Sequence, residues 1–175
     1  MIWCQGYSEP NAGSDLASLQ TKAELVNGEW VINGQKIWTS TAQYAHMMFC
    51  LVRTEPDASK HAGISYLLIP MDTPGIEIRP LVDMTLKAGF NEVFFTDVKI
   101  PETNIVGSRG EGWAVANATL GHERGSLAPP DAIMSRLNTL IELMQQETLD
   151  GKPLSDDSIY RDRLMKIQAK VMAFQ

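Results

Sequence analysis

The sequence is poor in cysteine and in clustered positive charge, and both shortages narrow the classes of protein it can encode. Only two of its 175 residues are cysteines, Cys4 and Cys50, and neither has a CxxC partner or a histidine at metal-ligand spacing. A disulfide scaffold and a zinc site are therefore disfavoured, and a reducing cytoplasm is the expected location. The 15 basic residues are scattered and are outnumbered by 21 acidic ones, which gives a net charge of −6. We therefore expect no nucleic-acid partner and no anionic membrane partner.

A long apolar run is also missing. No stretch is long enough to span a bilayer, and the first ten residues contain Gln5, Ser8 and Glu9, which argue against a secretory signal. Hydrophobic residues make up 44% of the chain and charged residues 21%, which is typical of a globular protein. A chain of 175 residues can bury one core, or one domain with a smaller appendage. We expect a soluble, unprocessed protein.

Up to residue 108 the sequence is typical of strands and turns. Asn27-Gly28 and Asn33-Gly34 tolerate the positive φ angles of tight reversals, and they bracket a short apolar run. Four further runs rich in β-branched and aromatic residues are separated by proline and glycine: residues 47–52, 64–69, 76–81 and 93–100. This pattern predicts an antiparallel β-barrel or sandwich over residues 1–108.

From residue 109 onward the period of the apolar residues becomes helical. Two faces are predicted, one with Ile133, Leu137, Leu140, Ile141 and Met144, the other with Leu164, Ile167, Val171 and Phe174. Ser155, Asp156 and Asp157 are candidate caps for the last helix. Because that helical pattern runs to Gln175 without a stop signal, we expect a fragment whose helical part, residues 109–175, is truncated. The predicted fold class is α+β, an antiparallel β-barrel followed by a truncated helical segment.

Two polar segments interrupt the strand-like sequence, residues 8–15 and residues 34–40. Both offer hydroxyls, small residues and free backbone amides where a protein interior would need apolar side chains, which is typical of a cofactor site. Each also has an ordinary structural interpretation. The first is compatible with a glycine turn in which Asp15 caps a short helix, and Trp38 in the second is compatible with a core tryptophan.

Four motifs in order resemble the acyl-CoA dehydrogenase family of flavoproteins: Tyr7-Ser8-Glu9-Pro10, Ala12-Gly13-Ser14-Asp15, Asn33-Gly34-Gln35-Lys36-Ile37-Trp38, and Val93 to Pro101. Four matches in the right order are far more specific than any one of them. The resemblance covers the middle β-barrel domain of the family and the start of its C-terminal helical domain, less than half of a complete member. It implies FAD as the cofactor, an acyl-CoA substrate, an electron-transfer flavoprotein as electron acceptor, and a homo-oligomer.

The resemblance also implies which residues bind the cofactor: Gln5, Tyr7, Ser8, Gly13, Ser14, Trp38, Thr39 and Ser40. Ser8 and nearby backbone groups would hydrogen-bond the flavin ring, Trp38 would pack against it, and Ser40 would supply a hydroxyl where the family more often has threonine. Ser14 would lie between the cofactor and the thioester, and so would contact the substrate too. Fixed N–H and O–H donors suit a ring that gains negative charge on reduction.

Gly121-His122-Glu123-Arg124 lies in the helical part. By the resemblance, Arg124 would bind the substrate near its thioester. Glu123 occupies the position of the catalytic base in the branch that includes isovaleryl- and long-chain-type dehydrogenases. Other members take the base from a later helix, and an exposed Glu–Arg pair is also common at protein surfaces, so the origin of the base stays open.

Two departures from the family pattern fall near this segment. Gly125 and Pro129-Pro130 interrupt what is usually one long helix, which could displace Glu123 and Arg124. The Arg-x-x-Phe-Gly-type segment, which in many members contacts FAD of a neighbouring subunit, is missing, and residues 147–153 stand near its place.

The function implied is FAD-dependent α,β-dehydrogenation of an acyl-CoA thioester to a trans-2-enoyl-CoA. Two alternatives stay open. An acyl-CoA oxidase-like enzyme would differ in whether oxygen reaches the reduced flavin. A non-catalytic β-barrel module for binding or assembly would use the same fold without the chemistry. The length and branching of the acyl chain are not predicted, because the residues lining its tunnel lie in other parts of the family fold.

Overall fold

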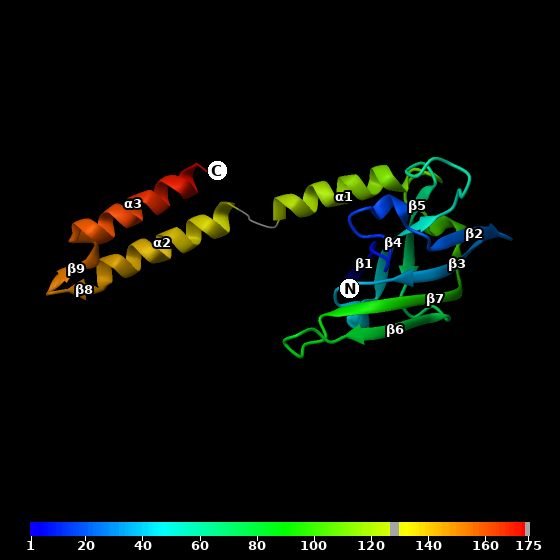
Figure 1. The fold of residues 1–175 in the computed structure, drawn as a ribbon, viewed down its shortest axis with the longest axis horizontal. Coiled ribbons are helices and arrows are strands. Elements are labelled where there is room, and N and C mark those ends of the chain that lie inside the picture. Colours follow the sequence, from blue (N-terminus) through cyan, green and yellow to red (C-terminus); the bar gives the residue numbers. More distant parts are fainter. Residues whose placement is uncertain (127–129, 174–175) are drawn as a thin grey trace. The chain divides into compact units, whose positions relative to one another are not determined.

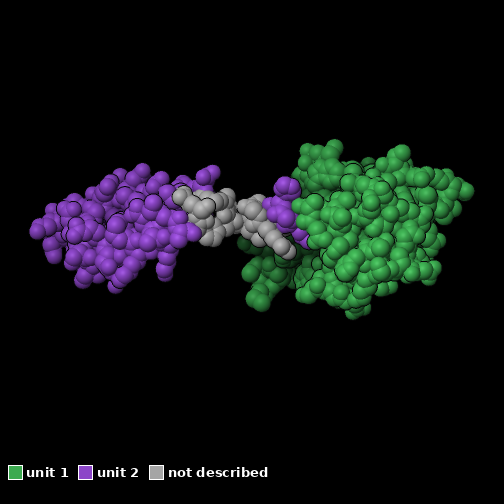
Figure 2. Space-filling model, turned by 90° about the horizontal axis from the view of Figure 1, so that it is seen from above, with its two compact units in different colours: residues 1–119 green, residues 120–175 purple. Residues whose placement is uncertain are grey.

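The computed structural model describes residues 1–126 and 130–173, without the side chains of residues 123–126 and 130. The chain divides into two compact units, Met1–Thr119 and Leu120–Gln175, which Figure 2 shows in different colours. Each unit is described by itself below.

The first unit is built on one seven-stranded sheet that curls into a half-barrel (Figure 1). Its strands are β1 (Trp3–Gly6), β2 (Lys22–Val26), β3 (Glu29–Lys36), β4 (Met47–Arg53), β5 (Ile64–Pro70), β6 (Ile76–Leu81) and β7 (Phe90–Pro101). The order is β1-β4-β2-β3-β7-β6, and β5 pairs with β4. Most pairs are antiparallel, whereas β1 and β2 run parallel to β4. The predicted α+β class is confirmed.

The two Asn-Gly dipeptides have different roles. Asn27 and Gly28 have φ angles of 51° and 81°, and they form the predicted tight turn between β2 and β3. The predicted reversal at Asn33-Gly34 is wrong, because β3 continues through it and only shifts its register against β7. Gly34 is needed there for close approach, since a Cβ on it would lie 2.6 Å from the Cα of Thr21.

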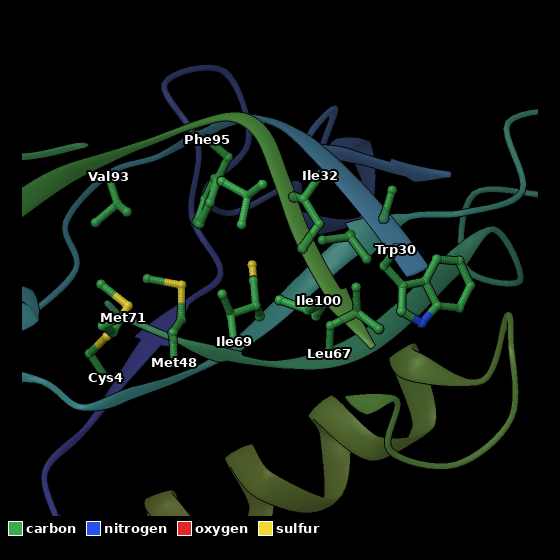
Figure 3. Close-up of a cluster of buried hydrophobic side chains, with 14 of the residues drawn as sticks. Cys4, Trp30, Ile32, Met48, Leu67, Ile69, Met71, Val93, Phe95 and Ile100 are labelled. Atoms are coloured by element: carbon green, nitrogen blue, oxygen red, sulfur yellow. The ribbon is translucent and has the colours of Figure 1, made fainter. Parts of the chain in front are cut away.

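The core of the first unit lies on the concave side of the sheet (Figure 3). Trp30 and Ile32 from β3 pair with Ile100 and Val98 from β7, and all four side chains are almost completely buried. Burying each large apolar side chain contributes about 1.5–3 kcal/mol. This core fixes the curvature of the sheet and therefore the positions of the loops at its edges.

Helices and short turns complete the structure. Helix α1 (Gly112–Ser126) begins against β5, where a Cβ on Gly112 would lie 2.4 Å from the carbonyl carbon of Ser65. Within the described residues, four short 3-10 turns connect other elements: Leu16–Ser18, Ala42–Tyr44, Glu102–Asn104 and Leu154–Asp156. No described helix is both long and apolar enough to cross a membrane.

The second unit contains a pair of helices, α2 (Pro130–Gln146) and α3 (Ser158–Met172), joined through the two-residue strands β8 (Thr148–Leu149) and β9 (Lys152–Pro153). Its buried cluster is Leu137, Met144 and Leu164, which the helical period predicted. Asp157 is the N-cap of α3, because its carboxylate accepts hydrogen bonds from the N–H groups of Ile159 and Tyr160. Ile167, predicted on the apolar face, is 44% exposed, and Phe174 lies outside the described residues.

Candidate functional site

One backbone hydrogen bond brings the two polar segments of the sequence together. The N–H of Ile37, just after β3, donates to the carbonyl of Ser8 at 2.9 Å. Ser8 therefore lies beside the end of β3, next to the residues that lead into Trp38. Two of the predicted cofactor-binding segments thus form one surface, although some 30 residues separate them in the sequence.

The first segment folds back on itself after Ser8. Glu9 and Ala12 exchange two backbone hydrogen bonds, at 2.8 and 3.0 Å, which closes a tight turn around Pro10. Asp15 precedes the 3-10 turn at Leu16–Ser18 without capping it through its side chain, which instead contacts Lys60 Nζ at 2.8 Å. The predicted Gly13 and Ser14 are exposed, and the space around Gly13 is open.

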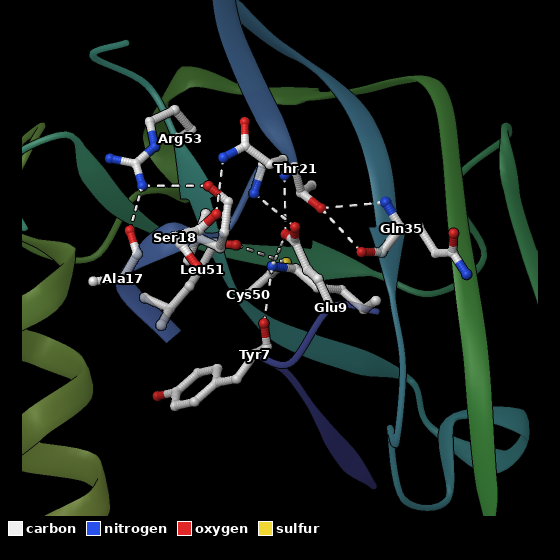
Figure 4. A network of polar contacts seen from close by, with 12 residues as sticks. Tyr7, Glu9, Ala17, Ser18, Thr21, Gln35, Cys50, Leu51 and Arg53 are labelled. Atoms are coloured by element: carbon white, nitrogen blue, oxygen red, sulfur yellow. Dashed lines mark hydrogen bonds and ion pairs between the residues drawn. The ribbon is translucent and has the colours of Figure 1, made fainter. Parts of the chain in front are cut away.

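Arg53 of β4 hydrogen-bonds to the main chain of residues 17–21, which follow this turn. Its guanidinium donates to the carbonyls of Ala17 at 2.6 Å and Leu19 at 3.3 Å, as Figure 4 shows in part. Its own backbone N–H donates to the carbonyl of Thr21 at 2.7 Å. Residues 17–21 are therefore held against the sheet, and they form a fixed base for the exposed turn before them.

A buried ion pair lies directly beneath the point where the segments meet. The Lys36 ammonium contacts the Glu9 carboxylate at 2.8 Å, and the two residues are 0% and 8% exposed. Burial alone would raise the pKa of the Glu9 carboxyl. The positive charge and hydrogen bond of Lys36, with hydrogen bonds from Gln20 and Thr21, instead hold that pKa below its ordinary value.

The second segment presents an aromatic surface. The Trp38 side chain is 59% exposed, and its ring meets the ring of Phe90 edge-on with centroids 6.0 Å apart. Trp38 and Thr41 both have positive φ angles, 59° and 56°, which large or β-branched residues rarely adopt. Such backbone conformations are concentrated at functional sites, and here the conformation accompanies an indole that is turned toward solvent.

Thr39 lies between these residues but points into the protein. It is 1% exposed, its N–H donates to the carbonyl of Asn91 at 3.0 Å, and its carbonyl accepts from Asn91 Nδ2 at 2.9 Å. Its buried hydroxyl has no partner within the part of the chain that the structure describes. The contacts of Thr39 with Asn91 fix the main chain between Trp38, which has the positive φ, and the exposed Ser40.

Free hydrogen-bond donors accompany the aromatic surface. Among the described residues, no partner is found for the N–H groups of Ser8, Trp38 and Ser40. A flat apolar indole beside several free donors suits a planar ring that carries carbonyl and nitrogen acceptors. Beneath this surface, the buried hydroxyl of Thr39 has no partner among the described residues. The residues present therefore fit a flavin.

The remaining predicted site residues are in different surroundings. Gln5 is half-buried in β1. Tyr7 is 5% exposed and belongs to an aromatic cluster, with its ring 5.9 Å from that of Phe49 and its hydroxyl 3.4 Å from that of Tyr66. The side chains of Glu123 and Arg124 lie outside the described residues.

Sequence reasoning missed Phe90, Asn91 and the Glu9–Lys36 pair. The predicted strand began at residue 93, whereas β7 begins at Phe90, which places Phe90 and Asn91 opposite the second polar segment. An aromatic residue followed by an asparagine, shortly before the predicted strand, was the available signal. No local pattern indicated that Glu9 and Lys36 meet.

Comparison with known proteins decides the family. Residues 4–98 match the profile described as "Acyl-CoA dehydrogenase, middle domain", and residues 110–175 match "Acyl-CoA dehydrogenase, C-terminal domain". This chain belongs to the acyl-CoA dehydrogenase family. The motif order that indicated the family is thereby confirmed.

Relatives within the family agree in sequence and in fold. The chain is 49% identical over 167 residues to acyl-CoA dehydrogenase IpdE1 of Mycobacterium tuberculosis, which covers 94% of this chain and 42% of that protein. The crystal structure of the ChsE4-ChsE5 complex from the same organism superposes with a TM-score of 0.79 at 35% identity, over 99% of this chain and 45% of that one. A glutaryl-coenzyme A dehydrogenase in complex with glutaryl-CoA superposes with a TM-score of 0.80 at 29% identity, over 97% and 44%. This chain therefore spans less than half the length of these relatives.

Proposed function

We propose that this chain supplies the flavin-facing surface of an FAD-dependent acyl-CoA dehydrogenase, which converts an acyl-CoA thioester to a trans-2-enoyl-CoA. One observation carries the proposal: the Ile37–Ser8 hydrogen bond joins the segment of Ser8 to the segment of the exposed Trp38 indole, and no partner among the described residues is found for the N–H groups of Ser8, Trp38 and Ser40. Membership of the family and the flavin-compatible chemistry of the surface support the same conclusion.

The cofactor-binding residues have distinct roles in this proposal. Ser8, Trp38 and Ser40 provide donors toward the flavin ring, and Trp38 also covers its face and excludes water. Tyr7 anchors the first segment beside the flavin, because its carbonyl accepts from Lys36 and its side chain is committed to the aromatic cluster. Thr39 holds the segment that carries Trp38 and Ser40 through its hydrogen bonds with Asn91, and Gln5, Gly13 and Ser14 form the edge of the surface.

FAD, when bound, supplies the acceptor for the hydride that leaves the β-carbon of the substrate. Side chains contribute the other roles. Ser14 contacts the thioester arm and Arg124 binds near it, while a carboxylate removes the α-proton. Glu123 is the candidate for that carboxylate within this chain.

The proposal extends to organisation and partners. We assign residues 1–108 to the flavin-binding β-barrel domain and residues 109–175 to the start of the helical domain. The substrate is an acyl-CoA, an electron-transfer flavoprotein accepts the electrons, and the protein assembles as a homo-oligomer. The ChsE4-ChsE5 complex, to which this chain is similar in fold, supports association within this fold.

Substitution of Trp38 tests the flavin surface. Trp38→Ala is expected to weaken FAD affinity by at least about tenfold, because it removes the apolar face against the ring. Trp3→Ala, which removes another exposed tryptophan outside the site, is the matched control and should bind FAD normally. Unchanged FAD affinity in Trp38→Ala would favour a β-barrel module without a flavin.

Substitution of Glu123 tests the catalytic role separately. In protein loaded with FAD, Glu123→Gln should abolish bleaching of the flavin by acyl-CoA under anaerobic conditions while leaving FAD affinity unchanged. Wild-type bleaching in this variant would assign the base to another residue. Rapid reoxidation of the bleached protein by oxygen would instead identify an oxidase.

A further inference from the structure

We propose that the buried Glu9–Lys36 pair is a positioning device for the cofactor surface. It holds the main chain of residues 7–9 against the end of β3, and so fixes the spacing between Ser8 and the segment from Trp38 to Ser40. This inference rests on the proposed flavin site and names the residues that set its geometry.

Lys36 reaches across the junction from the end of β3. Its ammonium, which is buried together with the whole side chain, donates to Glu9 Oε1 at 2.8 Å and to the carbonyl of Tyr7 at 3.1 Å. Lys36 is only two residues before Trp38. The Lys36 side chain therefore connects the Tyr7 carbonyl of the first segment to the end of β3, where the second segment leaves the strand.

Glu9 also binds the main chain of residues 20–21, directly before β2. Its Oε2 accepts from the N–H of Gln20 at 2.6 Å, and its Oε1 accepts from the N–H of Thr21 at 2.9 Å. Figure 4 shows Glu9 between Thr21 and the main chain of Tyr7. Both carboxylate oxygens are thus used, so the turn carrying Ser8 is fixed on one side to residues 20–21 and on the other to β3.

The direction of the carbonyls explains what the pair does for the surface. The carbonyl of Tyr7 accepts from Lys36, the last residue of β3, and the carbonyl of Ser8 accepts from the N–H of Ile37, just after β3. The N–H of Ser8 is left without a partner among the described residues, as are those of Trp38 and Ser40. By holding the Tyr7 carbonyl inward, next to the Ser8 carbonyl that Ile37 holds, the pair keeps acceptors away from the position where the flavin needs donors.

A pair of this kind is not required for stability alone. Buried ion pairs can often be replaced by apolar residues of similar volume without loss of stability, because the cost of desolvating both charges disappears. An apolar side chain at position 36 cannot hold the carbonyl of Tyr7 in a fixed direction. Loss of the pair should therefore affect the cofactor surface even where stability is restored.

Three variants separate positioning from stability. Lys36→Met removes the ammonium, Glu9→Gln keeps the volume of the side chain while removing its charge, and the double variant removes both charges together. Lys22→Met, which breaks the exposed pair between Lys22 and Glu24, controls for loss of a surface lysine. Ile100→Ala, at the opposite end of the β3–β7 pairing, controls for loss of stability.

Two measurements are made on each protein. The first is the FAD dissociation constant, with the shape of the flavin absorption band in the bound form. The second, made without FAD, is hydrogen exchange at the N–H of Ile37, with the N–H of Thr39 as an internal reference because it bonds to Asn91 instead.

We expect at least about tenfold weaker FAD binding and faster exchange at Ile37 in the Lys36 variants, including a double variant of wild-type stability, with Thr39 unchanged. Ile100→Ala should lose stability and keep both the FAD affinity and the shape of the flavin absorption band.

A stable double variant with wild-type FAD affinity, band shape and hydrogen exchange at Ile37 would overturn the inference, as would failure of all three variants to fold. Wild-type protein that does not bind FAD would overturn the proposed function and this inference with it, whereas binding that is equal in every variant would overturn this inference alone.

Discussion

Single residues in this chain carry costs that the rest of the structure has to offset. Trp38 and Thr41 occupy the left-handed region of φ, which costs about 1–3 kcal/mol at a bulky residue. The hydrogen bonds between Thr39 and Asn91 supply part of the compensation. Glu9 and Lys36 are charges removed from water, and the desolvation of each is offset by the 2.8 Å contact with the other. These residues with unfavourable conformational or desolvation free energies therefore lie near the place where the two polar segments meet.

The buried charge pair makes stability depend on pH in a defined direction. Because the folded-state pKa of Glu9 is lowered, its contribution to stability is complete above the ordinary glutamate pKa and is lost as pH falls through the lowered value. Glu9→Gln should cost about 3–5 kcal/mol at neutral pH, since it leaves the Lys36 ammonium buried without a counter-charge. The difference from wild type should shrink as the solution is acidified. Urea unfolding over the acidic range checks this, and a gap that is constant with pH would contradict it.

Both cysteines should be inert in the folded protein. Burial, with a contribution from Cys50, raises the pKa of Cys4 to about 12. Burial likewise raises the pKa of Cys50 to about 11, where Lys36 opposes the shift and Glu9 adds to it. Since only the thiolate reacts, a disulfide reagent at about pH 8 should label neither thiol until denaturant is added. Rapid labelling of the native protein would show that the core opens or that these thiols are misplaced.

At the scale of elements, strand β3 connects the core to the site. Its first half pairs with β7 around Trp30 and Ile32, and its last residue, Lys36, holds the first polar segment. The register shift between Ile32 and Gly34 bends β3 between its core-forming first half and its last residue, which binds the first polar segment. Asn33 stabilises the bend, because its side chain accepts from the N–H of Asp97 at 2.9 Å and donates to the Asp97 carboxylate at 3.0 Å.

Two glycine substitutions compare the bend with the hairpin turn. Gly34→Ala should destabilise the protein by about 2–5 kcal/mol, because the new Cβ would meet Thr21 in addition to the unfavourable φ. Gly28→Ala, which has open space around it and a φ of 81°, should cost only about 1–2 kcal/mol. Thermal unfolding of both variants measures the difference. Equal losses would mean that close packing against Thr21 is not what requires a glycine in β3.

The elements also show which features local sequence could predict. The strand over Ile76–Leu81 and the turn at Asn27-Gly28 were predicted with their observed bounds, because period and turn chemistry are local signals. Asn33-Gly34 was predicted wrongly because the same dipeptide chemistry serves a bulge as well as a turn. The Glu9–Lys36 contact and the pairing of Trp38 with Phe90 depend on residues 27 and 52 positions apart, and no periodicity encodes such distances. Motif order predicted the segments of the candidate site but not what holds them together.

At the scale of the whole chain, the two units differ in how much they bury. The first has an extended core drawn from all seven strands except β6, which contributes half-buried residues. The second has three buried residues, Leu137, Met144 and Leu164, among those described. A helical pair with so small a core is marginally stable by itself.

The units should therefore open independently. Backbone amides in α2 and α3 are expected to exchange with deuterium well before those in β3, β4 and β7, because few buried contacts protect them. Hydrogen exchange followed by mass spectrometry distinguishes the two sets of peptides. Equal protection across both units would contradict the assignment of two separate cores.

The measurement that tests the central claim most directly is a titration of the wild-type chain with FAD, followed by flavin absorbance and by quenching of tryptophan fluorescence, with FMN as the control. The account predicts saturable binding that is selective for FAD and quenching that disappears in Trp38→Ala. A chain shown to be folded by circular dichroism that binds neither flavin would contradict the claim that the surface around Ser8 and Trp38 is by itself a flavin site.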